Sequence, residues 1–163
     1  MSDGRASQPP VLVPVDFSPH SLAALVWGSR MSDLLGASLE VLHVVHDPES
    51  NPGYYKQGNR SVQRMEKAAA KMMDSFMERA IEDYPEITSL KSAHRELVGG
   101  LPVNRILEVA AQRQACLIVM GSQGLSGLPK LLLGSKAQRV VQLSPIPVTI
   151  VKAAQAELEG VEI

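Results

Sequence analysis

The chain has 163 residues, 45% of them hydrophobic, which is typical of a single globular domain with a sizeable core. Sixteen basic and seventeen acidic residues give a formal net charge of -1 at pH 7, which argues against a large electrostatic footprint on nucleic acid or anionic membrane. No apolar run approaches the ~20 residues that span a bilayer, and the polar start is unlike a signal peptide, so we expect a cytoplasmic protein.

The single cysteine, Cys116, excludes an internal disulfide bond. It lies in the apolar run Ala115–Met120. We therefore expect it to act as a small buried hydrophobic residue rather than as a reactive thiol.

Residues 1–10 are expected to form a flexible N-terminal arm, because Pro9 and Pro10 resist joining a helix. The nearly continuous aliphatic run Val11–Phe17 then predicts a strand that is buried on both faces. Pro14 removes one ladder donor, so this strand is expected to pair irregularly or to end near that position.

A helix is predicted next, with Ser18 as its N-cap, Pro19 in its first turn and Gly36 as a left-handed stop. The residues expected on its apolar side are Leu22, Ala23, Leu25, Val26, Leu34 and Leu35.

Leu39–Val45 predicts a second strand, which leads into a turn-rich loop that ends near Asn59. Apolar residues at helical spacing predict a long helix from about Ser61 to Tyr84, closed by Pro85. The methionines of this helix are expected to fill the core.

The second half of the chain continues the alternation of strands and helices. A polar strand within 91–98, a helix at Pro102–Arg113, a buried strand at Cys116–Gly121, a helix at Ser135–Leu143 and a last strand at Pro147–Val151 are predicted. We expect one domain over residues 11–152 and an acidic C-terminal tail over 153–163.

Strands that alternate with helices predict right-handed crossovers, and therefore a single-domain α/β fold with an open parallel five-stranded sheet covered by helices on both faces. The most apolar strands, the first and the fourth, belong in the middle, and the polar third strand suits an edge. The expected order is 3-2-1-4-5, a Rossmann-like sheet with its switch point between the first and fourth strands. Ligands of such sheets bind beyond the carboxyl ends of the strands at that point, which nominates Asp16 and the loop after Met120.

That loop, Gly121–Ser135, is rich in glycine, which lets the backbone turn tightly and approach a ligand. Gly134 and Ser135 then open a helix, whose first amide groups have no partner within the helix. Free amides at the positive end of a helix form an anion site, to which Lys130 and Lys136 can add charge. The loop therefore predicts phosphate binding.

The motifs of the common nucleotide enzymes are missing from the sequence. It contains no G-x4-G-K-[ST], and no G-x-G-x-x-G follows the first strand. Instead, the sequence resembles the ATP-binding branch of the universal stress protein family over nearly all of Val11–Lys152. The resemblance rests on G-x2-G-x9-G-[ST], met by Gly121, Gly124, Gly134 and Ser135, and on V-P-V-D-F-S, L-H-V, I-V-M-G-S and P-V-T-I-V in the same order.

The resemblance implies an adenine nucleotide alpha hydrolase-like fold and a set of site residues for ATP, ADP or AMP with Mg²⁺ or Mn²⁺. Pro14, Val15 and Val44 would line the adenine slot, with Met120 near the base and ribose, and Asp16 would bind the ribose hydroxyls or a divalent ion. The phosphates would be held through amides and a hydroxyl by Gly121, Ser122, Gly124, Gly134, Ser135 and Lys136. Coulomb repulsion between a carboxylate and bare phosphates fits this placement of Asp16.

The sequence departs from the family pattern at Gln123, where many relatives have histidine, and at Lys136, where a small aliphatic residue is common. Lys136 could strengthen phosphate binding or point to solvent, and Pro129 could reshape the loop. The four histidines show no metal-ligand spacing. His43 is expected to be a hydrogen-bonded core residue, and His46 and Asp47 to lie near the site.

The final strand, Pro147–Val151, is apolar on both sides yet is expected at a sheet edge, which invites pairing. Universal stress proteins commonly dimerise through this strand, so the resemblance implies a symmetric homodimer about it. The alternative is a tail that folds over the edge.

Three functions remain open on the sequence. The first is a nucleotide-dependent regulatory module of the stress response. The second is an enzyme of nucleotide hydrolysis or transfer that uses the same pocket, although no catalytic set is recognisable and only slow ATP hydrolysis is expected. The third is a dimeric interaction protein with a vestigial pocket.

Overall fold

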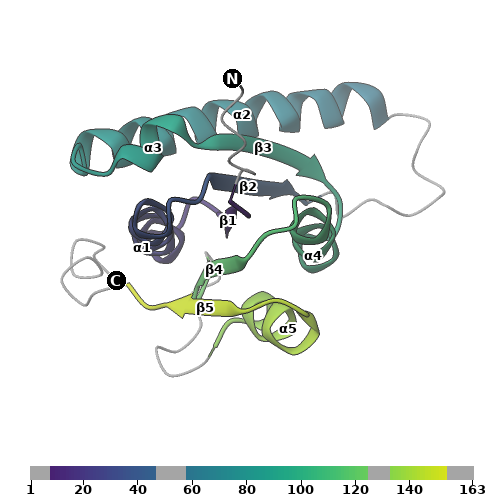
Figure 1. Ribbon diagram of the computed structural model, residues 1–163. Coiled ribbons are helices and arrows are strands. Elements are labelled where there is room, and N and C mark those ends of the chain that lie inside the picture. Colours follow the sequence, from purple (N-terminus) through teal and green to yellow (C-terminus); the bar gives the residue numbers. More distant parts are fainter. Residues whose placement is uncertain (1–7, 47–57, 125–132, 154–163) are drawn as a thin grey trace, which may run out of the picture.

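The computed structural model describes residues 8–46, 58–124 and 133–153 (Figure 1). In chain order, its elements are β1 (Val11–Pro14), α1 (Pro19–Leu35), β2 (Leu39–Val45), α2 (Gly58–Asp83), α3 (Thr88–Ser92), β3 (His94–Gly99), α4 (Pro102–Gln112), β4 (Leu117–Gly121), α5 (Ser135–Leu143) and β5 (Val148–Val151).

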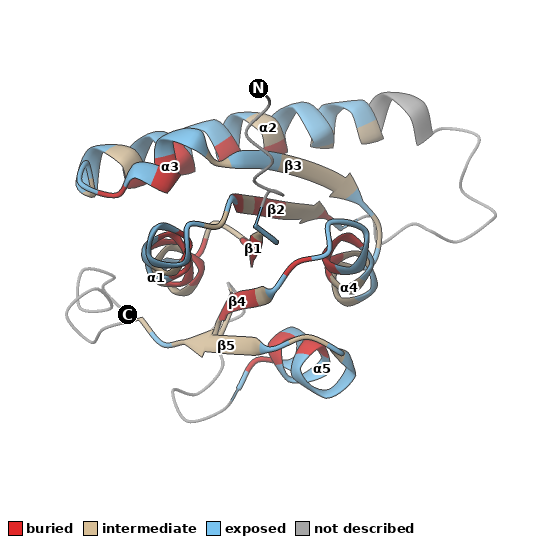
Figure 2. Ribbon diagram, in the orientation of Figure 1, coloured by how far each residue is buried: buried red, intermediate tan, exposed pale blue. Residues whose placement is uncertain are grey.

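The five strands of the described chain form one parallel sheet in the order β3-β2-β1-β4-β5, which confirms the predicted topology. Helix α1 lies on one side of the sheet, and α4 and α5 lie on the other (Figure 1). Two hydrophobic clusters fill the space between the sheet and the helices on its two faces, and buried residues concentrate on the central strands (Figure 2). Alternate residues of each strand face opposite clusters, so both faces of the sheet are core.

The start and end of α1 follow the sequence signals. The Ser18 side chain accepts a hydrogen bond from the Ser21 amide, and Gly36 ends the helix with φ 63°. The prediction of its apolar side is wrong at its C-terminal end, because Leu34 and Leu35 are 81% and 49% exposed. In this part of the helix the buried residues are small instead, namely Gly28, Ser29 and Ser32.

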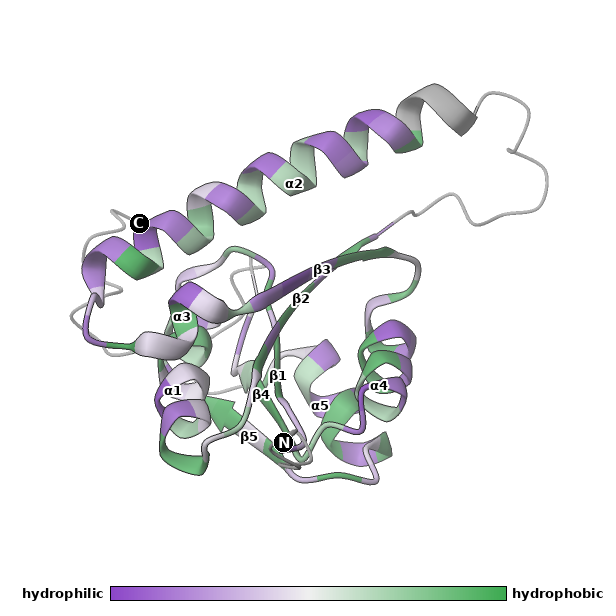
Figure 3. Cartoon of the chain, turned by 45° about the horizontal axis from the view of Figure 1, so that its top comes forward, coloured by the Kyte–Doolittle hydropathy of each residue, from purple (hydrophilic) through white to green (hydrophobic). Residues whose placement is uncertain are grey.

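Helix α2 begins three residues earlier than expected and extends beyond the sheet, with hydrophobic and hydrophilic residues alternating along it (Figure 3). Met73 and Met77 are buried in the core, as predicted for the methionines. Met65 and Met72 are not core residues, because this end of the helix passes over a cavity instead of over packed side chains, and Met72 is 51% exposed.

The short helix α3 was not predicted from the sequence. The side chain of its N-cap residue, Ile87, makes no capping hydrogen bond. The carboxylate of Asp33, at the end of α1, accepts hydrogen bonds from the Thr88 and Ser89 amides and from the Thr88 hydroxyl at 3.0–3.1 Å. A carboxylate at a helix N-terminus also interacts favourably with the helix dipole, so a residue distant in sequence supplies the cap.

The expectation that Cys116 is buried is wrong, because its side chain is exposed. The strand begins one residue later, at Leu117, so Cys116 lies at its rim, with its Sγ 3.3 Å from the carbonyl oxygen of Pro9. The first strand likewise ends at Pro14, as the missing amide of proline suggested. None of the described helices combines the length and the apolar character that crossing a bilayer requires.

The contact of α1 with the sheet yields a stability prediction at Gly28. A Cβ added there would lie 2.6 Å from Cγ2 of Val13 and 3.4 Å from Cβ of Val119. Although alanine favours a helix interior by up to about 1 kcal/mol, the overpacking typically costs about 1–3 kcal/mol. Gly28→Ala should therefore lower the urea unfolding midpoint, whereas Gly99→Ala, whose added Cβ would have no described atom within 4 Å, should leave it nearly unchanged. A Gly28→Ala midpoint equal to or above that of the unmodified chain would contradict this packing.

Candidate functional site

A cavity of about 530 Å³ opens beyond the carboxyl ends of β1, β2 and β4, where the fold places its switch point. Its volume lies within the ~300–1,000 Å³ of small-molecule sites. The lining comes from several elements of the chain: Pro14, Val15, Asp16, Ser21, Leu42, His43, Val44, Val45, His46, Met65, Ala68, Ala69, Met72, Pro102, Ile106, Met120, Gly121, Gln123, Gly124, Gly134, Ser135, Lys136 and Ala137.

Asp16 is positioned by the tight turn between β1 and α1. One carboxylate oxygen, Oδ1, accepts a hydrogen bond of 3.0 Å from the Ser18 amide. Phe17 has φ 67°, an uncommon value for a bulky residue, and its ring packs against those of His43 and Phe76. The ring packing stabilises a strained backbone that keeps the carboxylate of Asp16 at the cavity.

Two histidines line the cavity beside Asp16, His43 within β2 and His46 directly after it. His43 Nδ1 is 2.8 Å from the carbonyl oxygen of Val15, so this half-buried ring is hydrogen-bonded as expected. His46 lines the cavity, also as expected, whereas Asp47 lies outside the described residues. The bond of His43 ties the ends of β1 and β2 together beside Asp16.

The glycine-rich segment after β4 is fastened by its backbone. The Ser122 amide donates to the Val151 carbonyl oxygen, and the Gly134 amide donates to the Ser122 carbonyl oxygen, both at 2.8 Å. These two amides are therefore not free to hold a phosphate, contrary to the role expected of them. The Ser122 side chain is buried, 3.4 Å from His20 Nδ1, and does not line the cavity.

The start of α5 is the part of the site suited to an anion. Its N-cap, Gly134, has no side chain to accept from the first amides of the helix. Ser135, Lys136 and Ala137 occupy the first turn and line the cavity, where helical amides have no partner within their own helix. Lys136 lines the cavity and is exposed, so its side chain does not plug the cavity. Pro129 and Lys130 lie outside the described residues.

The opposite end of the cavity is apolar. Met65, Ala68, Ala69 and Met72 of α2 form one wall there, next to the end of β2. Pro102 and Ile106 of α4 add to the apolar lining. The cavity thus combines an apolar end under α2 with a polar, cationic end at α5.

The structure gathers the predicted site residues with one exception. Pro14, Val15, Asp16, Val44, Met120, Gly121, Gly124, Gly134, Ser135 and Lys136 line the cavity, and Ser122 does not. The walls from α2 and α4 could not be predicted from the sequence. Their residues are apolar and at helical spacing, which in sequence looks the same as core packing.

Among the described lining residues, Asp16 is the single carboxylate. Its Oδ2 faces Gly124, where an added Cβ would lie 2.5 Å away. Mg²⁺ is commonly bound through one or two carboxylates together with substrate phosphates and water. Asp16 therefore fits a metal ion that is held jointly with a phosphate ligand. One carboxylate provides too few ligand atoms to hold the ion alone.

The fold and cavity together define an open, doubly wound α/β domain with a ligand crevice at its switch point. The model of the universal stress protein family matches residues 9–152, and the chain belongs to that family. It is 32% identical over 145 residues to a universal stress protein of Thermus aquaticus, encoded in the QAH/OAS sulfhydrylase 3'region, with 87% of this chain and 97% of that protein covered.

Solved structures of universal stress proteins share the fold of this chain. The universal stress protein UspA from Lactobacillus plantarum superposes with a TM-score of 0.71 at 27% identity, covering 90% of this chain and 99% of that one. Two structures with adenine nucleotides share the fold. A universal stress protein in complex with cAMP has a TM-score of 0.66 at 23% identity, with 89% and 97% covered. One from Archaeoglobus fulgidus in complex with dAMP has a TM-score of 0.60 at 19% identity, with 88% and 97% covered.

Two glycines of the site should respond differently to alanine. A Cβ on Gly121 would lie 2.8 Å from the backbone carbonyl group of His20, which cannot move without shifting α1. Among the described residues, a Cβ on Gly124 would meet only the carboxylate end of Asp16, which can rotate away. Gly121→Ala should thus lower the free energy of unfolding, measured in urea, by about 1–3 kcal/mol. Gly124→Ala should change it by no more than about 0.5 kcal/mol. Equal effects of the two variants would show that the backbone approach at β4 is not as tight as described.

Proposed function

We propose that this chain is an adenine-nucleotide-binding regulatory protein of the cytoplasmic stress response, with ATP as its ligand and a homodimer as its working form. The observation that carries the proposal is the polarity of the cavity. An apolar end under α2 suits a base, and an uncapped helix start beside a lysine suits phosphates. Family membership and the neighbours in complex with cAMP and dAMP support an adenine nucleotide.

In this proposal each part of the ligand meets matching chemistry. The base lies between Val15, Val44 and the methionines of α2, and Met120 packs near the ribose. Phosphates accept hydrogen bonds from the first amides of α5 and from the Ser135 hydroxyl, and Lys136 adds a charge from the mouth. The helix dipole contributes only about 0.3–2 kcal/mol, so these hydrogen bonds supply most of the affinity.

Asp16 binds the ribose hydroxyls, or shares a Mg²⁺ or Mn²⁺ ion with the phosphates. Its Oδ1 is already occupied by the Ser18 amide, which leaves Oδ2 for the ligand. When bound, the metal neutralises phosphate charge. The chain itself supplies orientation, and nucleotide occupancy would then change its stability or its choice of partner.

The homodimer is proposed to form through β5. This strand is a sheet edge, paired with β4 alone in the described chain, and all four of its residues are half-buried. A second copy placed by a two-fold axis would continue the sheet and cover the apolar edge.

Nucleotide binding should appear directly in thermal unfolding. If ATP binds with a Kd of about 10 μM, millimolar Mg-ATP stabilises the fold by about 2.7 kcal/mol, which raises the melting temperature by about 5–10 °C. Lys136→Ala should reduce the shift, because one charge is removed from the phosphate end. Lys91→Ala, an exposed lysine of α3 outside the cavity, is the matched control.

Nucleotide extracted from freshly purified protein and identified by mass would reveal whether ATP, ADP, AMP or a cyclic form is the natural occupant. A melting curve unchanged by every adenine nucleotide, with nothing extracted, would reject the proposal in favour of a vestigial pocket. Phosphate release at many turnovers per minute, abolished by Gly134→Asp, would instead make the chain a hydrolase.

The dimer can be tested through the direction of the β5 backbone. The carbonyl oxygens of Pro147 and Val151 accept bonds from β4, so the amide of Ile150 points to the open edge. Ile150→Pro removes that donor and should give a monomer in analytical ultracentrifugation. Ile150→Ala loses the same side chain but keeps the amide, and should remain dimeric. A monomeric unmodified chain, or a dimeric Ile150→Pro variant, would exclude this interface.

A further inference from the structure

A second group of polar side chains lies at the other end of the sheet from the cavity. Glu40 is the second residue of β2, and His94 and Glu96 belong to the first half of β3. None of the three residues lines the cavity, whose lining on β2 begins at Leu42, two residues and about 6.6 Å of strand beyond Glu40. The group is therefore separate from the candidate nucleotide site.

The register of the sheet brings the three side chains together. His94 is the parallel partner of Glu40, and Glu96 is the partner of Leu42, two residues further along the same faces of the strands. Leu42 belongs to the cluster under α4 and α5, so all three side chains lie on that side. One ligand atom from each of the three lies within 4.8 Å of the others.

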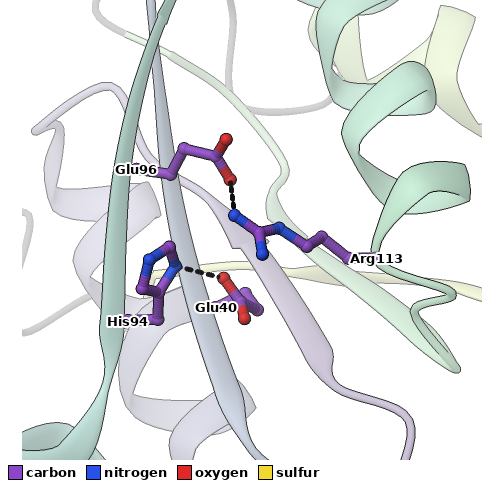
Figure 4. A network of polar contacts seen from close by, with 4 residues as sticks. All are labelled: Glu40, His94, Glu96 and Arg113. Carbon is purple, nitrogen blue, oxygen red and sulfur yellow. Dashed lines mark hydrogen bonds and ion pairs between the residues drawn. The ribbon is translucent and has the colours of Figure 1, made fainter.

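The contacts of the group are shown in Figure 4. His94 Nδ1 is 2.6 Å from Glu40 Oε2, and Arg113, which follows α4, donates to Glu96 Oε2 at 3.2 Å. The Glu40 side chain is only 13% exposed, and His94 at 53% exposure is the one partner that the described residues offer it. With a neutral imidazole, two carboxylates face a single guanidinium, which leaves a net negative charge.

We propose that Glu40, His94 and Glu96 form a binding site for a divalent transition metal ion of the Zn²⁺ class. One imidazole nitrogen and two carboxylate oxygens are ligands that Zn²⁺ accepts, with water in the fourth position. Donors about 2.0–2.1 Å from a tetrahedral ion are about 3.3 Å apart, so the farthest pair of ligand atoms needs to close by at most about 1.5 Å. His94 Nδ1 and Glu40 Oε2, which are 2.6 Å apart, need to open by about 0.7 Å. The ion takes the place of the hydrogen bond between His94 and Glu40.

Arg113 is the competitor for this site. Its guanidinium holds Glu96 by an ion pair of which both sides are partly exposed, at 42% and 25%, and such pairs contribute little to stability. The arginine can therefore turn to solvent when the ion binds. Removing its charge should strengthen metal binding, a result that a merely structural ion-pair network does not predict.

The test is titration of the tag-free full chain with Zn²⁺ in the absence of nucleotide, followed by calorimetry, with Co²⁺ absorption as a report of ligand geometry. One ion per chain is expected. His94→Gln and Glu40→Gln should each weaken binding about tenfold or more, and Arg113→Gln should tighten it several-fold. Asp74→Asn is the matched control, because it breaks the ion pair of Arg95, a β3 residue on the opposite face of the sheet.

Thermal melting of each variant without metal checks that the fold is retained, and His94→Gln, at an exposed position, serves if Glu40→Gln is unstable. The proposal is overturned if the unmodified chain binds no Zn²⁺. It is equally overturned if His94→Gln and Arg113→Gln both bind as the unmodified chain does, since the ion would then sit elsewhere. Because no nucleotide is present, either result leaves the proposed ATP site untouched.

Discussion

The candidate site depends on the divergence of the chain at the carboxyl ends of β1 and β4. After β1 the chain enters α1 on one face of the sheet, and after β4 it reaches α5 on the other. No helix can cover the gap between two neighbouring strands whose connections leave in opposite directions, so a crevice remains there. Asp16 stands on one side of this crevice and the glycine-rich segment on the other. The position of the site is thus a property of the topology before any side chain contributes.

The walls of the crevice are supplied unequally. β1 and the start of α5 give it polar groups, while α2 and α4 give it methyl and thioether groups. Methionine is flexible and polarizable, so Met65 and Met72 can adapt to a flat ring without a rigid fit. Backbone amides at α5 are fixed by the helix and require no rearrangement to meet an anion. A ligand with one flat and one anionic end satisfies both walls at once, which neither an apolar ligand nor a free phosphate does.

The sequence was sufficient for the fold because its local signals agree with its topology. Doubly apolar strands, a serine-proline helix start and a glycine stop all predicted elements that the structure confirms. The errors fall where tertiary contacts override local patterns. Leu34 is exposed because the buried positions in the C-terminal half of α1 are taken by small residues, Gly28, Ser29 and Ser32. Helix α3 could not be foreseen from its own residues, because Asp33, more than fifty positions earlier in the sequence, supplies its cap.

The candidate nucleotide site and the group of Glu40, His94 and Glu96 differ in how far the sequence predicts them. A site at the carboxyl end of a parallel sheet can be recognised from local motifs, because a glycine-containing loop and a helix start follow each other along the chain. The group of Glu40, His94 and Glu96 has no such motif, since its members come from two strands separated by the whole of α2 and α3. Only the register of β2 with β3 makes Glu40 and His94 neighbours, and a shift by one residue would send one of them to the other face of the sheet. Strand order alone, which the sequence did predict, therefore places such residues on adjacent strands but cannot bring them together.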